Sequence, residues 1–161
     1  MTHSLKTIDN MELLNQSILE GKYICNKFSM INEICEKIEY IYATIYFTKF
    51  SLYIKKTKEK LKIKINVIAI SKDLINFLNY LPYNIDDLVI PQLIIKETLN
   101  NLPVNLKKMT IINCAGNEYW TLEYLKKTKL PYNIKIFLKD NIINKKEVVI
   151  NNFNLTIKDI F

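Results

Sequence analysis

The sequence predicts an α/β fold, a short solenoid with a parallel sheet and an N-terminal helical cap. Two observations lead to this fold class. Leu-Pro-x-Asn followed by an aliphatic residue recurs at residues 81–85, 102–106 and 130–134, and each copy runs into a short apolar segment. Helical spacing of apolar residues is clearest in the first forty or so positions. A phrase that recurs every 20 to 50 residues or so is typical of repeat architectures.

Residues 1–45 are predicted to form the helical cap. Asp9 and Glu12 have the spacing of a capping box, which marks the start of a helix. Gly21 then gives a stop signal. A second helix is expected over residues 29–41, where isoleucines recur at helical spacing.

Residues 46–161 are predicted to form the repeat region. Aliphatic residues follow the template L-x-x-x-L-x-x-L-x-I in three consecutive units, which begin at Leu61, Leu81 and Leu102, and a fourth unit at Leu130 fits in part. In each unit the proline fixes φ and sets a turn before the strand, and the asparagine bonds nearby backbone. The aliphatic positions of neighbouring units stack, because no single coil can bury its own apolar face.

The shared template predicts strands and a core. Strands are expected at residues 65–70, 88–90, 109–113 and 134–138, parallel and in chain order in one sheet. The side chains expected to be almost fully buried are Ile85, Leu88, Ile90, Leu106, Met109, Ile111, Ile134 and Phe137.

Leu-Pro-Val-Asn-Leu at residues 102–106, followed by Lys-Lys-x-x-Ile at residues 107–111, resembles the leucine-rich-repeat-like units called FNIP repeats. Such repeats occur in amoebae and in large DNA viruses of amoebae. The resemblance covers the chain from Leu61 to Phe161, but the usual glycine after the strand is missing and the period is irregular. It implies a leucine-rich-repeat-like protein that binds other proteins and has a viral or amoebal origin. Family members often carry an F-box, but the helices expected before Tyr40 lack its Leu-Pro start, so none is assigned.

Composition limits the function further. The chain has 161 residues and a formal net charge of +7, and all 23 basic residues are lysine. This charge favours anionic partners, but the lack of arginine argues against sequence-specific reading of DNA. Only two glycines occur, which excludes a P-loop and a dinucleotide-binding fingerprint.

No catalytic constellation is found, so we expect no enzyme, no cofactor and no metal site. His3 is the single histidine, so the sequence does not predict a metal site built from histidines or a catalytic triad. Cys114 has no neighbouring general base in the sequence that would activate it as a nucleophile. Asp86 and Asp87 are adjacent, so their side chains should point to opposite faces of a strand and cannot form a pair of catalytic carboxylates. The odd count of three cysteines indicates reduced thiols. No signal peptide and no membrane span is seen, so we expect a cytoplasmic protein, in the host cytoplasm or the virion if it is viral.

The alternation of side chains along a strand predicts a row that points away from the core. This row is unusually apolar, and such patches usually mark a partner site. The other interpretation is that the N-terminal helices cover it. The predicted partner-binding residues are Val67, Ala69, Asp87, Val89, Lys108, Thr110, Ile136 and Leu138.

The preferred function is a non-enzymatic protein–protein interaction module, with a protein or a second copy of the chain on that row. One alternative is a ubiquitin-ligase substrate adaptor. The other is a compact basic α+β domain that binds nucleic acid or is structural in a virus particle. The basic stretch from Lys55 to Lys64, with Tyr53 and Phe50 nearby, would serve nucleic-acid binding. The plainer interpretation is a solvated lysine face, with Tyr53 and Phe50 in the core.

Overall fold

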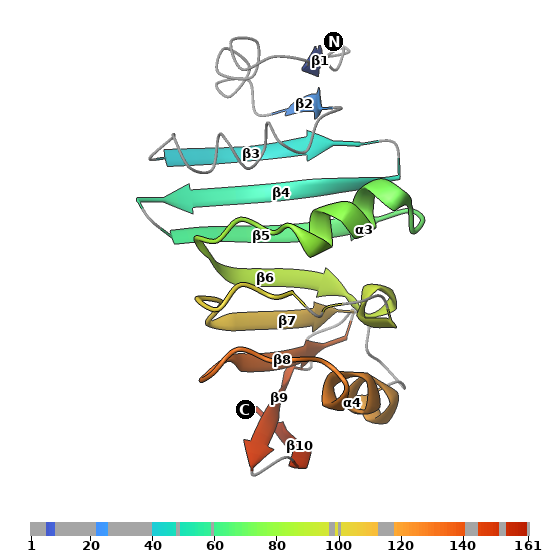
Figure 1. The fold of residues 1–161 in the computed structure, drawn as a ribbon, viewed down its shortest axis with the longest axis vertical. Coiled ribbons are helices and arrows are strands. Elements are labelled where there is room, and N and C mark those ends of the chain that lie inside the picture. Colours follow the sequence, from blue (N-terminus) through green and yellow to red (C-terminus); the bar gives the residue numbers. More distant parts are fainter. Residues whose placement is uncertain are drawn as a thin grey trace.

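The computed structural model describes residues 6–8, 22–25, 40–47, 49–58, 60–96, 99, 101–112, 118–140, 145–151 and 154–160, with side chains from residue 44 onward except at residue 96. The described strands form one mixed sheet whose order follows the chain from β1 to β10 (Figure 1). The strands are β1 (Lys6–Ile8), β2 (Lys22–Cys25), β3 (Tyr40–Tyr46), β4 (Phe50–Thr57), β5 (Lys60–Val67), β6 (Ile85–Pro91), β7 (Lys108–Ile112), β8 (Lys135–Lys139), β9 (Lys145–Asn151) and β10 (Asn154–Asp159). The helices among the described residues are α3 (Lys72–Asn79), the 3-10 helix η2 (Gln92–Lys96) and α4 (Glu118–Lys126).

The centre of the sheet is parallel. β5 pairs with β6, β6 with β7 and β7 with β8, all in parallel orientation. The connections run through α3, η2 and α4. The predicted parallel order of four strands is therefore confirmed, but the first of them was expected at residues 65–70 and lies at Lys60–Val67.

The predicted solenoid is wrong, because antiparallel strands flank this centre. β3 pairs antiparallel with β4 and β4 with β5, while β8, β9 and β10 form an antiparallel group at the other end. β4 and β5 join through a tight turn in which Lys58 has φ 55°, as two-residue hairpin loops require. A stack of equivalent coils would keep every strand parallel, so the chain is a mixed α/β sheet.

The predicted N-terminal helical cap is also wrong. Within residues 1–45 the described segments are strands, and β1 and β2 extend the sheet beyond β3. β3 crosses the predicted boundary at residue 45, and its Tyr-Ile-Tyr-Ala-Thr-Ile-Tyr sequence suits a strand, since aromatic and β-branched residues favour strands. Residues 9–21 and 26–39, which hold most of the two expected helices, lie outside the described residues.

The core lies between one face of the sheet and the helices, which are drawn on the same side of it in Figure 1. Phe77 of α3, Ile94 of η2 and Leu125 of α4 belong to one buried cluster with side chains of β4 to β9. Ser71 caps the start of α3, and its Oγ accepts a hydrogen bond from the Leu74 amide at 3.2 Å. This cap satisfies an amide that would otherwise lack a partner at the start of the helix.

The repeated Leu-Pro-x-Asn phrase makes the same turn hydrogen bond three times. In each copy the amide of the aliphatic residue donates to the carbonyl of the proline. The distances are 3.2 Å for Ile85 to Pro82, 3.1 Å for Leu106 to Pro103, and 3.4 Å for Ile134 to Pro131. The phrase therefore sets the entry to each of the strands β6, β7 and β8.

The predicted core is confirmed for seven of the eight expected side chains, from Ile85 to Ile134, and wrong for Phe137. Ile136 and Leu138 are buried instead, at 0% and 1% exposure. The buried residue after the turn comes three positions later in the earlier units, Ile85 to Leu88 and Leu106 to Met109, but two positions later at Ile134. One residue fewer exchanges the two faces of a strand.

Candidate functional site

The side of the sheet opposite the helices carries most of the charge. We call it the open face: the side chains of β4 to β9 that point away from the buried cluster, a face on which none of the described helices packs. Strand alternation, pairing and the bulge in β6 assign to it eight lysines and three carboxylates, Asp86, Asp87 and Glu147. The lysines are Lys55, Lys60, Lys62, Lys64, Lys108, Lys135, Lys139 and Lys145.

One line of this face is cationic. Reading across the strands in register gives Lys55 on β4, Lys62 on β5, Asp87 on β6, Lys108 on β7 and Lys135 on β8. We call the four lysines of this line the cationic row. Nζ of Lys62 lies 3.8 Å from Oδ2 of Asp87, so one carboxylate compensates part of the charge.

The next line across the strands is more apolar. It consists of Tyr53 on β4, Lys64 on β5, Val89 on β6, Thr110 on β7 and Phe137 on β8, and we call it the apolar row. Val89 and Thr110 are each 8% exposed, so neighbouring side chains of the same face shield them. The two rows lie two residues apart along each strand.

Two ammonium groups lie near the ring of Phe137. Nζ of Lys145 lies 4.2 Å from the ring centroid and Nζ of Lys108 lies 5.3 Å from it. Both distances are within the range of a cation–π contact. An aromatic ring with two lysines beside it is a place where a flat group and an anionic group can be held together.

The lysines of the open face repel one another. Burial lowers the pKa of Lys145, the charges of Lys108 and Lys139 lower it further, and only Asp87 among its partners acts in the opposite direction. A bound anion would relieve this repulsion.

The structure brings together half of the predicted partner-binding residues. Asp87, Val89, Lys108 and Thr110 lie on the open face, where Asp87 is paired with Lys108 and Val89 with Thr110 in register. The other predicted residues lie elsewhere. Val67 packs against the buried cluster, Ala69 lies in the bend after β5, and Ile136 and Leu138 are core residues, because of the change of register in β8.

Sequence reasoning missed the lysines of the later strands. The stretch from Lys55 to Lys64 was visible, but Lys135, Lys139 and Lys145 are far from it in the chain. Only the pairing of β5 to β9 places them on one face. Assigning each lysine of a predicted strand to a face would have found them, provided that the register of β8 was known.

A bulge changes the prediction for the adjacent aspartates. The register shifts between Leu61 and Lys62, opposite Asp86, so both Asp86 and Asp87 lie outside the core between the buried Ile85 and Leu88. Burial raises the pKa of Asp86, the charge of Asp87 raises it further, and Lys60 opposes this rise. The described residues contain no group of histidine, cysteine and carboxylate side chains that could hold a metal ion. His3 and Cys114 lie outside the described residues.

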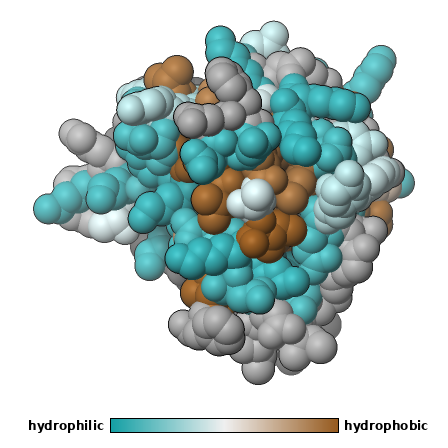
Figure 2. Space-filling model, turned by 90° about the horizontal axis from the view of Figure 1, so that it is seen from below, coloured by the Kyte–Doolittle hydropathy of each residue, from teal (hydrophilic) through white to brown (hydrophobic). Residues whose placement is uncertain are grey.

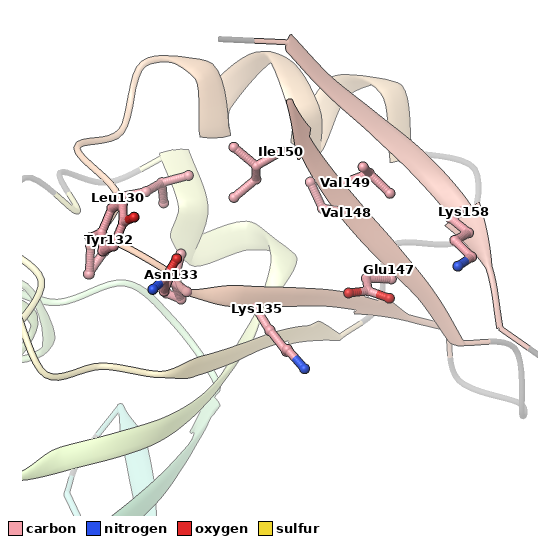
Figure 3. A pocket seen from close by; sticks show the side chains of 11 residues that line it. Leu130, Tyr132, Asn133, Lys135, Glu147, Val148, Val149, Ile150 and Lys158 are labelled. Atoms are coloured by element: carbon pink, nitrogen blue, oxygen red, sulfur yellow. The ribbon is translucent and has the colours of Figure 1, made fainter. Parts of the chain in front are cut away.

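A cleft opens where β8 and β9 diverge. Their pairing begins at Ile136 and Val148, while β9 continues to Asn151, and the space between has a volume of about 720 Å³. Figure 3 shows Leu130, Tyr132 and Ile150 around one part of this cleft, with the charged Glu147 and Lys158 farther along β9 and β10. The residues that line it are partly apolar and partly charged, and they do not form a set of side chains typical of a catalytic site.

The end of the molecule that carries β9, β10 and α4 has an apolar centre. Figure 2 shows hydrophobic residues gathered there and hydrophilic residues around them. Ile150 and Ile160 are among the exposed large hydrophobic residues of this part of the chain. Among the described helices, none has the length and apolar character that a bilayer crossing needs.

Comparisons of the chain with protein-family models, with curated proteins and with solved structures give no match. The resemblance to FNIP repeats therefore stays a prediction from the residues that carry it. Function has to be argued from the open face itself.

Proposed function

We propose that this protein is a non-enzymatic binding module whose open face holds an anionic macromolecule. The observation that carries the proposal is the concentration of charge. Eight lysines less three carboxylates leave a surplus of five positive charges on one face of one sheet, against a formal net charge of +7 for the whole chain. Such a field attracts anions and speeds their association.

The shape of the face supports a macromolecular ligand. The open face spans several strands and has no described helix over it, so it offers an extended surface. Small molecules are usually held in concave pockets. A sheet that is packed on its other side keeps the lysines at fixed spacings, which lowers the entropic cost of binding an extended partner.

This proposal retains the interaction module predicted from the sequence and changes its surface. An acidic protein or an acidic patch on a second copy would also meet the cationic row. A role as a ubiquitin-ligase adaptor or as a virion component stays a prediction, to which we assign no site among the described residues. We keep a cytoplasmic location, in a host cell or a virion, as part of the proposal.

The test is retention on a heparin column with two matched variants. Lys55→Glu/Lys135→Glu reverses two exposed charges of the cationic row, and Lys72→Glu/Lys129→Glu reverses two exposed charges away from the open face. Both variants have the same net charge. The first should elute at clearly lower salt than the second, and elution at the same salt would show that only net charge matters.

A further inference from the structure

We propose that the ligand of the open face is a single-stranded nucleic acid, with its phosphates on the cationic row and its bases on the apolar row. This inference rests on the proposed function and names the partner class of the same face. Its basis is the juxtaposition of two parallel lines of different chemistry, one cationic and one bearing Tyr53 and Phe137.

The two lines match the two sides of an unpaired strand. Neighbouring strands of a sheet are about 4.8 Å apart, so the cationic row from β4 to β8 crosses four spacings, about 19 Å. Successive side chains on one face are about 6.7 Å apart along a strand, which sets the separation of the two rows. A single strand places phosphates along one side and bases along the other. A duplex turns its bases inward and cannot use the apolar row.

Phe137 is the centre of the proposed contact. Lys145 covers its ring in the free protein, through a cation–π contact at 4.2 Å. Stacking of a base on an exposed aromatic ring is generally stronger than an exposed cation–π contact. A base would therefore displace Lys145, whose flexible stem lets its ammonium turn to the adjacent phosphate.

The rows favour a nucleic acid over an acidic protein. The lysines of the cationic row lie in one line, two on each side of Asp87, and such a line of charges suits a polymer with one charge per unit. An acidic protein surface has no need for an aromatic ring beside two ammonium groups. Because the chain has no arginine, the contact would be to phosphates and base faces, with little sequence preference.

The experiment is fluorescence anisotropy with a labelled 20-mer of deoxythymidine, the same length of duplex, and labelled polyglutamate. Four phosphate contacts predict that affinity for the single strand falls about 50-fold between 50 and 200 mM salt, from the slope of about 0.7 per contact for single strands. Phe137→Leu should weaken single-strand binding about 5-fold or more. Tyr119→Leu, which removes an exposed aromatic ring from α4, should have no effect.

The outcomes separate this inference from the proposed function. Stronger binding of the single strand than of the duplex, with loss in Phe137→Leu alone, supports both. Equal binding of single strand, duplex and polyglutamate, unchanged in Phe137→Leu, retains the anion-binding face and overturns the nucleic-acid inference. No binding of any of these polyanions overturns the proposed function itself. Thermal midpoints within a few degrees of the parent would show that each variant is folded.

Discussion

The ammonium nitrogen of Lys145 lies 4.2 Å from the centroid of the Phe137 ring, although the two residues are diagonal neighbours and not partners in register. Phe137 pairs with Glu147, and Lys145 with Lys139. A lysine of β7 and a lysine of β9 therefore meet at one ring of β8. The pKa of Lys145 should therefore depend on the charged side chains that surround it on the open face.

We predict that Lys108→Met raises the pKa of Lys145 and that Asp87→Asn lowers it. Burial is the largest cause of the lowered pKa of Lys145, followed by the charge of Lys108, while Asp87 acts in the other direction. Side-chain NMR titration of the lysine ammonium groups would measure both changes. An unchanged pKa in Lys108→Met would mean that the two ammonium groups do not share this site.

The lowered pKa of Lys145 also determines how the stability of the protein changes with pH. The folded state holds the Lys145 proton more weakly than the unfolded chain does, so unfolding takes up a proton between the lowered pKa and 10.5. Through that range the charge on Lys145 opposes folding progressively less as pH rises. The contribution of Lys145 to stability is therefore greater above this range than at neutral pH.

Asp86 should destabilise the protein at neutral pH. Burial and the charge of Asp87 raise its pKa, so the folded state binds the proton more tightly than the unfolded chain. Stability should therefore fall as pH rises from 3.8 through the raised pKa, and remain lower above it.

The prediction is that Asp86→Asn raises the urea midpoint at pH 7 and that this gain shrinks on acidification toward pH 4. Asp159→Asn, at the exposed end of β10, serves as the control for a general change in net charge. An equal gain in both variants would assign the effect to net charge and not to the bulge.

The register of β8 can be tested by stability. Ile136 and Leu88 are fully buried, so Ile136→Ala and Leu88→Ala should each lower the free energy of unfolding by about 2–5 kcal/mol. Phe137→Leu should cost less than about 1.5 kcal/mol, because the side chain is only half-buried on the open face and the change is nearly volume-conserving. Chemical denaturation measures all three. A larger loss for Phe137→Leu than for Ile136→Ala would return β8 to the register expected from the repeat.

Much of the parallel centre could be predicted because the repeated phrase has a local physical meaning. Pro82, Pro103 and Pro131 each accept the same turn hydrogen bond, and a strand follows each turn. The antiparallel flanks could not be predicted in the same way. Alternation along residues 60–67 indicates a strand with one buried face, but it carries no information about the direction of its neighbours.

The open face was predictable only in part. Asp87, Val89, Lys108 and Thr110 were placed on one face because the first two units share their spacing. Phe137 was assigned to the core because a single missing residue after Ile134 is invisible in a pattern of aliphatic positions. The loss of that residue exchanges every side chain of β8 between faces, and with them the aromatic centre of the candidate site.

The turn before β8 differs from the other two in one backbone angle, and that angle supplies the last prediction. Asn133 has φ 61°, whereas Asn84 and Asn105 at the same place in the other phrases are not among the described residues with positive φ. Asparagine tolerates the left-handed region of positive φ because its short side chain can hydrogen-bond to nearby backbone. For alanine the same conformation costs about 1–2 kcal/mol. Glycine enters it freely.

Asn133→Ala should therefore lower the free energy of unfolding by about 1–2 kcal/mol. Asn133→Gly should be close to neutral, because its easier entry into this region is offset by the greater freedom of its unfolded chain. Asn105→Ala is the matched control: it makes the same chemical change at the same position of the phrase, and with φ in the ordinary region it should cost less than about 0.5 kcal/mol. Urea denaturation of the three variants measures the differences. Equal losses in Asn133→Ala and Asn105→Ala would mean that the side-chain amide, and not the backbone angle, is what each turn requires.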